Sequence, residues 1–229
     1  MEMETALKSG RGGRPSRSDS EVRVHAVLEV AKGKFLSQGY RETSLDSIAR
    51  DAGVAKKTLY GHFGSKAGLF DAIVRTLTDA WVEELRKIVA KENGADAVLE
   101  AAALHLLDVG TRRDMIELYR LLLVESRRFP TLVDTYRGRC GKLTGMEPLT
   151  EYLSRAVGRR ELELDDVDLA VEQFVHLVLG CVRSRMLLGR APRPNVTSRR
   201  RIARQAVAIF LSGCAAGAES RAAQACRSA

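Results

Sequence analysis

The sequence has few aromatic residues and no long apolar run. Only 5% of its 229 residues are Phe, Trp or Tyr, and Ala, Leu, Arg and Glu dominate, which favours helices over β-sheet. The longest stretch without a charged residue, Gln205 to Ala218, has 14 residues, whereas a membrane-spanning helix needs roughly 20 apolar residues. The first ten residues also lack the apolar centre of a secretory signal. We therefore expect a soluble, cytoplasmic, all-α protein without a membrane partner.

The cysteines are few and widely spaced. None belongs to a Cys-x-x-Cys pair or has a histidine beside it at metal-ligand spacing: Cys140, Cys181, Cys214 and Cys226. A structural zinc site or a disulfide framework would need such clustering or a secreted context. The cysteines are therefore interpreted as free thiols. For Cys140, which lies among basic residues that could lower its pKa, a redox-sensing role is the alternative.

Patterns that would indicate catalysis are also absent. The chain contains no Gly-x-Ser-x-Gly, no phosphate-binding loop and no His-Glu-x-x-His. His105 and His176 fall on apolar helical faces without a ligand partner at metal spacing, so they are interpreted as core or pocket residues. Asp165, Asp166 and Asp168 precede a helix, where acidic side chains cap the helix and complement its dipole. The sequence thus predicts no catalytic residue, no metal site and no cofactor.

The net charge of +8 is concentrated toward the amino-terminal end. Residues 1–66 contain 12 basic and 8 acidic side chains, an excess of +4 in less than a third of the chain. Residues 1–17 are rich in Gly and Arg and nearly free of apolar residues, so we expect a disordered arm. This arm is either simply solvated or inserts Arg11, Arg14 and Arg17 into a DNA minor groove, as basic arms do in other DNA-binding domains.

Three amphipathic segments between residues 18 and 66 have the spacing of a small helical domain. The first ends at Gly39 and places its apolar residues in one stripe: Val24, Val27, Leu28, Ala31 and Phe35. A short second helix begins after the capping residue Ser44 and stops at a glycine turn. A short third helix presents Leu59 to the same core. Two short helices joined by a tight turn, after a longer one, predict a helix-turn-helix motif over residues 44–63.

The rest of the chain predicts a larger helical domain over residues 67–214 and a flexible tail over residues 215–229. A long helix from about residue 66 to 91 has one apolar stripe and would connect the two domains. The other expected helices cover about 95–109, 112–128, a segment broken by Gly and Pro at 131–157, 166–188 and 196–213. The segment 166–188 is apolar on nearly all sides, so it needs packing partners on more than one face.

The run from Tyr40 to Lys66 resembles the TetR family of bacterial transcription regulators. The family pattern has an aromatic residue followed by Thr-Ser, Ile-Ala, Ala-Gly-Val, Thr-Leu-Tyr-x-His-Phe and Ser-Lys at fixed spacing, and every part is present here. This similarity covers about residues 20–70. Further along, Leu-Tyr-Arg at 118–120 and Glu-Ser-Arg-Arg-Phe-Pro at 125–130 resemble the C-terminal domain of an AefR-like subgroup. The resemblance implies a DNA-binding regulator rather than an enzyme.

The resemblance also implies which residues contact double-stranded DNA. Lysines and hydroxyls reach base edges or phosphates, and helix N-termini attract phosphate oxygens. The positions that match the family's DNA contacts are Ser44, Lys56, Lys57, Thr58, Tyr60, His62 and Lys66. Two departures weaken the recognition helix, because Ala55 lacks the side-chain cap of about 1 kcal/mol and Gly61 costs up to about 1 kcal/mol relative to Ala. We hypothesise that this helix orders fully only on DNA.

A homodimer and a ligand pocket are further implications of the family. The last two long helices would form a four-helix bundle with those of a second copy, and a small apolar or amphipathic effector would bind inside the larger domain. Candidate lining residues are Trp81, Leu85, His105, Tyr119, Leu122, Phe129 and Phe174, although ordinary core is the more common role for any one of them. The implied function is a repressor that leaves a palindromic operator when its effector binds.

Alternatives from other functional classes stay open at this point. A helical-bundle enzyme or small-molecule-binding protein could retain a vestigial helix-turn-helix, in which case Lys57 and Tyr60 would be dispensable. A non-specific DNA-coating protein would bind without a preferred site and with steep salt dependence. Residues 185–204, with seven arginines and no acid, are either a solvated loop and helix end or a second nucleic-acid surface.

Overall fold

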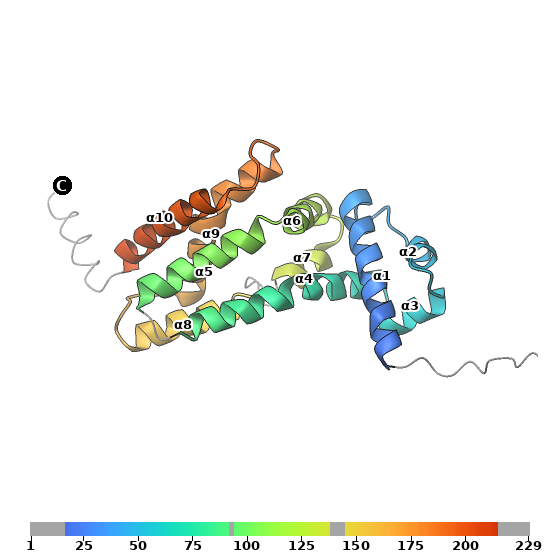
Figure 1. Cartoon of the computed structure of the whole chain (residues 1–229), viewed down its shortest axis with the longest axis horizontal. Coiled ribbons are helices and arrows are strands. Elements are labelled where there is room, and N and C mark those ends of the chain that lie inside the picture. Colours follow the sequence, from blue (N-terminus) through green and yellow to red (C-terminus); the bar gives the residue numbers. More distant parts are fainter. Residues whose placement is uncertain (1–16, 92–93, 138–144, 215–229) are drawn as a thin grey trace, which may run out of the picture.

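The computed structural model describes residues 17–91, 94–137 and 145–214, and these residues form ten helices and no strand. The ten helices are α1 (Arg17–Gln38), α2 (Leu45–Asp51), α3 (Lys56–Phe63), α4 (Lys66–Val89), α5 (Ala95–Gly110), α6 (Arg113–Glu125), α7 (Pro130–Arg137), α8 (Glu147–Gly158), α9 (Val167–Leu187) and α10 (Val196–Cys214). Helices α1 to α3 make a small head at one end of an elongated molecule, and α5 to α10 make a larger body (Figure 1). The all-α expectation is confirmed.

The head folds around an aromatic cluster supplied by α1, the following loop and α4. The ring of Tyr40 stacks on Phe35 at 5.4 Å between centroids and meets the edge of Phe70 at 5.7 Å. Gly39 ends α1 with φ +88°, a left-handed conformation that glycine adopts without a steric penalty. Ile48 of α2 and Leu59 of α3 are fully buried beneath the two short helices. These contacts fix the angle between α2 and α3.

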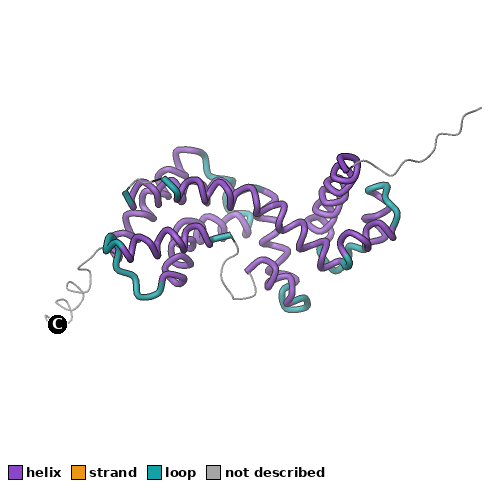
Figure 2. Tube along the Cα trace, turned by 90° about the horizontal axis from the view of Figure 1, so that it is seen from below, coloured by secondary structure: helices purple, strands orange, loops and turns teal. Residues whose placement is uncertain are grey.

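Helix α4 joins the head to the body as one uninterrupted rod (Figures 1 and 2). Ser65 caps its start, where the hydroxyl oxygen accepts a hydrogen bond from the Gly68 N–H at 3.1 Å. Phe70 and Ile73 near this end are buried in the head, while Trp81 and Leu85 are buried in the body. The apolar stripe predicted from the sequence therefore packs partly in the head and partly in the body. A tilt of α4 would displace side chains in both.

The body is built around α5, which packs against α4, α9 and α10. The middle of α5 is buried on several sides by these neighbours. Small and branched side chains there have no measurable exposure: Leu99, Ala102, Ala103 and Leu107. Helix α8 packs against both α4 and α9. Within the described ranges, no helix has both the length and the apolarity that crossing a membrane requires.

Helix boundaries differ from the expectation in the middle of the body. The helix expected to reach residue 128 ends at Glu125, and the segment expected as one broken helix at 131–157 is two helices, α7 and α8. Gly145 has φ +86° and Pro148 lies in the first turn of α8, so neither suits a continuous helix. The arm residues Arg11 and Arg14, Cys140 and the tail 215–229 lie outside the described residues, whereas Arg17 begins α1.

The basic segment 185–204 is partly used inside the chain. Arg193 donates through Nη2 to the carboxylate and the carbonyl of Asp108, at 2.8 and 2.7 Å. Arg199 lies 3.4 Å from the same carboxylate, and Arg204 donates to Glu100 at 3.0 Å. Three of the seven arginines therefore fasten α10 and the loop before it to α5.

Candidate DNA-binding surface and internal cavity

The start of α2 is held by a side-chain cap. The hydroxyl oxygen of Ser44 accepts a hydrogen bond from the Ser47 N–H at 3.1 Å, and Ser44 itself has extended backbone geometry. Asp46 in the first turn complements the helix dipole. Ser44 is exposed, so the N-terminal end of α2 is open to an approaching phosphate group.

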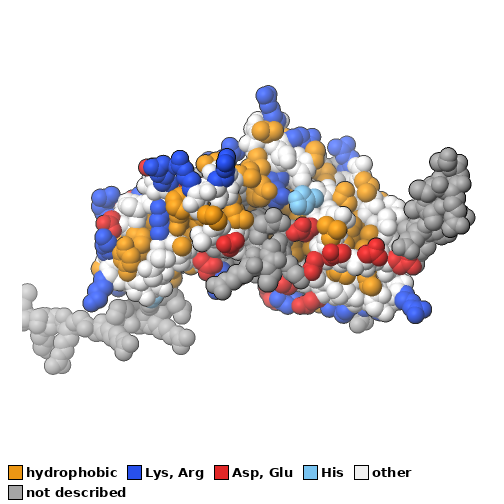
Figure 3. Space-filling view, turned by 180° about the vertical axis from the view of Figure 1, so that it is seen from behind, with side chains coloured by type: hydrophobic (Ala, Val, Ile, Leu, Met, Phe, Trp, Pro, Cys, Tyr) orange, Lys and Arg blue, Asp and Glu red, His pale blue; other side chains and the backbone are white. Residues whose placement is uncertain are grey.

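Helix α3 buries one side and exposes the other. Leu59 is 1% exposed and faces the core, while Tyr60 is 44% exposed. The residues assigned to DNA contact on α3 are all exposed: Lys56, Lys57, Thr58, Tyr60 and His62. Ala55 occupies the N-cap position without a side-chain hydrogen bond, as expected from its methyl side chain. Figure 3, which views the molecule from behind relative to Figure 1, shows Lys and Arg side chains over the head.

The two lysines at the start of α3, Lys56 and Lys57, differ in whether their ammonium groups are paired with a carboxylate. The Nζ of Lys56 lies 2.7 Å from the Asp46 carboxylate and 5.9 Å from the centre of the Tyr60 ring. The hydrogen bond with Asp46 raises the pKa of Lys56 above its usual value. Lys57 has no ion-pair partner among the described residues. Lys57 is therefore immediately free for a phosphate or a base, whereas Lys56 must first leave Asp46.

Lys66 has a structural role that the sequence did not indicate. Its Nζ donates to the carbonyl of Arg41 at 3.2 Å and lies 4.4 Å above the centre of the Tyr40 ring. Burial lowers the pKa of Lys66, and the nearby carboxylate of Glu125 partly offsets this effect. The ammonium group, assigned from the sequence to a phosphate contact, thus lies half-buried in the joint between head and body.

The same joint contains a buried carboxylate from the body. Glu125, the last residue of α6, is 8% exposed and accepts a hydrogen bond from the Arg41 N–H at 3.1 Å. Phe129, just beyond α6, meets the edge of the Tyr40 ring at 5.0 Å. We call Tyr40, Arg41, Lys66, Glu125 and Phe129 the head–body joint. The signal for it in the sequence was weak: one acid directly after the apolar run Leu121–Val124.

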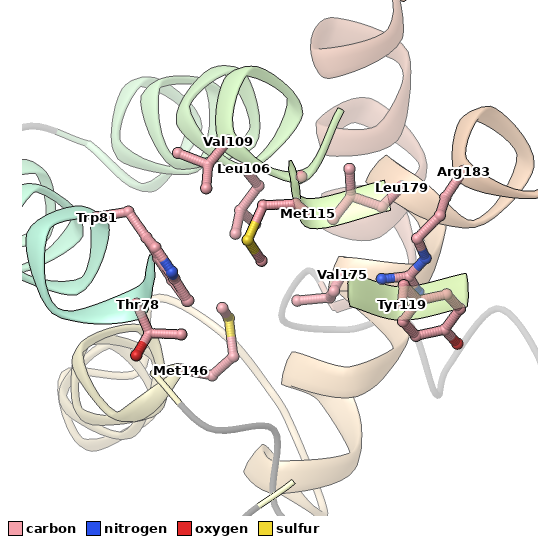
Figure 4. A pocket seen from close by; sticks show the side chains of 11 residues that line it. Thr78, Trp81, Leu106, Val109, Met115, Tyr119, Met146, Val175, Leu179 and Arg183 are labelled. Carbon is pink, nitrogen blue, oxygen red and sulfur yellow. The ribbon is translucent and has the colours of Figure 1, made fainter. Parts of the chain in front are cut away.

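The body contains a small cavity between α4, α5, α6 and α9, with a volume of about 60 Å³. Its lining is mostly apolar, from Leu106, Val109, Met115, Met146, Val175 and Leu179. Figure 4 shows these side chains converging on one space, with Trp81 on one side and Tyr119 and Arg183 on the opposite side. Thr78 and Gly110 complete the wall.

Two of the seven residues expected in a pocket, Trp81 and Tyr119, line this cavity, and five do not. Leu85 is fully buried one turn beyond Trp81 on α4, and Leu122 is buried one turn beyond Tyr119 on α6. Phe174 packs against Phe210 of α10 at 5.1 Å between ring centres. These three are core side chains that do not border this cavity. Apolar periodicity places a residue inside the body but does not say which interior side chains border a void.

The other two residues that do not line this cavity are His105 and Phe129. The Nε2 of His105 makes a 2.8 Å hydrogen bond with the backbone carbonyl of Trp81, so the imidazole supports the cavity wall from behind. Phe129 belongs to the head–body joint. Sequence reasoning missed the other nine lining residues, and among these Thr78, the two methionines and Arg183 do not stand out in an amphipathic pattern.

The polar groups of the cavity are few. The indole Nε1 of Trp81 is buried and has no hydrogen-bond partner among the residues that the structure describes, whereas the Thr78 hydroxyl donates to the Arg75 carbonyl at 3.2 Å. The guanidinium group of Arg183 lies 4.2 Å above the centre of the Tyr119 ring. No group of three or more His, Cys, Asp or Glu side chains in the described part of the chain is arranged to hold a metal ion.

Comparison with known proteins agrees with both parts of the fold. Residues 27–73 match the profile of the N-terminal domain of bacterial regulatory proteins of the tetR family. Residues 97–214, more than half of the chain, match the profile of the AefR-like transcriptional repressor C-terminal domain.

Among individual proteins, the repressor KstR2 of Rhodococcus jostii is 34% identical over 93 residues, which is 41% of each chain. The regulator TtgR of Pseudomonas putida is 26% identical over 197 residues, covering 76% of this chain and 85% of TtgR. The structure of the flavonoid-responsive regulator FrrA is 30% identical, with a TM-score of 0.70, and covers 86% of this chain and 98% of FrrA. The helix-turn-helix head, the AefR-like body and these relatives together show that the chain belongs to the TetR family of bacterial DNA-binding transcriptional regulators.

Proposed function

We propose that the protein is a repressor that binds a palindromic operator as a homodimer and is released by a small effector. The observation that carries this proposal is the course of α4. This helix begins in the head directly after α3 and continues to Trp81 in the cavity wall. One rigid element therefore links the DNA-contacting surface to a space in which a small molecule could bind.

The DNA-binding part of the proposal rests on the exposed side chains of the head. Lys57, Thr58, Tyr60 and His62 would enter the major groove with α3, because a recognition helix reads base edges there. The open N-terminal end of α2 at Ser44 would hold a backbone phosphate. Lys56 would exchange the Asp46 carboxylate for a phosphate.

The arm remains part of the proposal on sequence grounds. Arg11 and Arg14 precede α1 and are close in sequence to the head, and Arg17 opens α1. Basic residues beside a helix-turn-helix commonly add contacts in the neighbouring minor groove.

The homodimer is supported by an uncovered apolar face on the last two helices. Leu169 and Leu177 of α9 are 50% and 41% exposed, and Ile209 of α10 is 52% exposed. Large apolar side chains of this kind on neighbouring helices mark an interaction surface. A symmetric pairing of α9 and α10 would bury them. The two recognition helices would then have to lie about 34–36 Å apart to enter successive major grooves.

Release by an effector is supported by the apolar cavity and by the relatives. FrrA is described as flavonoid-responsive and KstR2 as a repressor. The cavity of about 60 Å³ is smaller than the roughly 150 Å³ that accommodates benzene, so an effector must push the walls apart. Such expansion would move α4, and an effector that prefers the expanded form would weaken DNA binding by its differential affinity, typically about 1–3 kcal/mol.

Fluorescence anisotropy tests the proposal directly. The wild type is titrated against labelled DNA from the region upstream of its own gene and against random DNA at physiological salt. We expect a preference of about 10³-fold or more for the specific site. Tyr60→Ala should abolish this preference, since it removes a side chain from the exposed face of α3. Lys87→Ala, on the exposed surface of α4 far from the head, is the matched control and should change nothing.

The alternatives predict different results in the same experiment. A non-specific coating protein would bind both DNAs equally, with steep salt dependence. A helical-bundle protein with a vestigial head would bind DNA weakly, and Tyr60→Ala would leave that binding unchanged. Equal binding of the two DNAs does not contradict the proposal, because the operator can lie elsewhere in the genome. The result that contradicts it is equal DNA binding by the wild type and by Tyr60→Ala.

A further inference from the structure

The cavity has one buried hydrogen-bond donor without an acceptor. Trp81 is 9% exposed, and its Nε1 has no hydrogen-bond partner within the described ranges of the chain. Since native proteins pair nearly all buried polar groups, such an exception needs an explanation. His105 bonds to the backbone carbonyl of Trp81 and leaves the indole N–H unused. In Figure 4 the indole ring lies along the cavity wall, opposite Arg183. An acceptor atom on a bound molecule would satisfy this donor.

The cavity also has an unbalanced positive charge. Arg183 is the only charged residue among those that line it. Its guanidinium group stacks on the face of the Tyr119 ring, which leaves the N–H groups at the edge of the guanidinium plane free to donate. Arg183 has no ion-pair partner among the described residues. A planar guanidinium group in this position is suited to a carboxylate or another anionic oxygen.

The space between the two polar groups is apolar and deformable. Met115 and Met146 project into it between Trp81 and Arg183 (Figure 4). Methionine side chains are unbranched and adapt to different shapes, so they are the residues that can give way when a ligand enters. The remaining contacts are aliphatic, which favours a ligand whose middle has no charge.

We propose that the effector is an apolar organic anion with a second hydrogen-bond acceptor. Its anionic oxygen pairs with Arg183, its body displaces the two methionines, and its second acceptor receives the hydrogen bond from the Trp81 indole. This inference rests on the proposed function of the cavity and adds the chemical class of its occupant. An anionic oxygen is supplied equally by a carboxylic acid or by an ionised phenol, and the two sources are separated by the test below.

Isothermal titration calorimetry with three matched probes tests both polar contacts. The probes are 4-methoxycinnamate, which has the anion and the second acceptor, its methyl ester, which lacks the anion, and 4-ethylcinnamate, which lacks the second acceptor. We expect the ester to bind about tenfold or more weakly than the acid, because a charge-assisted hydrogen bond is lost. The ethyl compound should bind several-fold more weakly than the methoxy compound. The phenol 7-hydroxyflavone, compared with flavone above and below neutral pH, tests the phenolate source.

Variants assign the two contacts to their residues. Arg183→Gln should remove the preference for acid over ester, and Trp81→Phe should remove the preference for methoxy over ethyl. Arg185→Gln is the matched control, since this arginine is exposed on the same helix and does not line the cavity. Equal affinity of acid and ester for the wild type, an acid preference that survives Arg183→Gln, or no binding by any acid or phenol probe would overturn the assignment.

A second readout separates this inference from the proposed function. Each probe is added to the protein–DNA complex, and release of DNA is followed by anisotropy. Release by the anionic probes, reduced in Arg183→Gln but not in Arg185→Gln, supports both proposals. Release by neutral probes alone leaves the regulatory function intact and refutes the anionic class. Tight binding of the acids without any release keeps the chemical class and refutes the regulatory role of the cavity.

Discussion

Removal of the Glu125 side chain should destabilise the protein far more than removal of a partly exposed acid on the same helix. Glu125 is 8% exposed and accepts the Arg41 N–H at 3.1 Å, and a hydrogen bond to a charged group contributes about 1.5–3 kcal/mol. The substitution Glu125→Ala also takes a negative charge away from the half-buried Lys66. Relief of the desolvated carboxylate offsets part of this loss. We expect the free energy of unfolding to fall by about 1–3 kcal/mol.

Urea unfolding followed by circular dichroism measures this difference, at one fixed protein concentration because association adds to apparent stability. Glu125→Gln keeps an oxygen acceptor and should lose less than Glu125→Ala. The matched control is Glu117→Ala, since Glu117 forms an i, i+3 ion pair with Arg120 on the outer side of α6; it should cost less than about 0.5 kcal/mol. Equal losses for the alanine variants at 117 and 125 would refute the reasoning.

Glu125→Ala also tests whether a displacement of the cavity walls is transmitted to the head. Helix α6 contributes Met115 and Tyr119 to the cavity wall and ends at Glu125 in the head–body joint. If α6 passes cavity expansion to the head, Glu125→Ala should reduce the ratio of DNA affinities measured without and with an effector. An unchanged ratio, with the stability loss still present, would show that α4 alone carries the coupling.

Four further outcomes follow, three from local contacts and one from the proposed dimer. Ser44→Ala removes the cap of α2 and should lower stability by about 1 kcal/mol in thermal or urea unfolding; no loss would mean that water replaces the hydroxyl. Gly145→Ala combines a left-handed φ with a new Cβ only 2.6 Å from the Trp81 ring, so it should cost more than about 1 kcal/mol and shift the tryptophan emission spectrum. Burial raises the pKa of the Cys214 thiol, so its alkylation rate should lag behind that of exposed Cys181 at pH 8 and catch up as the pH rises. A homodimer through α9 should protect Cys181 at high protein concentration, and mass spectrometry of tryptic peptides would detect both effects.

The head was predictable because its determinants are local. Ser44 as a cap, the glycine turn, and Leu59 facing inward while Tyr60 faces outward all follow from spacing within about twenty residues. The structure places Ser44 and the α3 residues as expected. Lys66 was the exception, because its position over the Tyr40 ring depends on how the end of α6 packs against the head.

The cavity was less predictable because a void is a property of packing. Leu85 and Trp81 occupy the same stripe of α4, yet only Trp81 borders the space. Phe174 is apolar and buried, but Phe210 of α10 fills its surroundings. Arg183 lies on a largely apolar helix, where sequence periodicity gives no reason to place a cation beside Tyr119. Only the three-dimensional arrangement brings these residues together.

The single tryptophan of the chain gives the protein a built-in optical reporter. All indole emission comes from Trp81, so no second fluorophore of this kind dilutes a change at the cavity. An occupant that accepts the indole hydrogen bond would alter the emission maximum, and one that only fills space beside the ring would alter its intensity. Effector binding can therefore be followed in the unlabelled wild-type protein, in the same cuvette as the DNA titration.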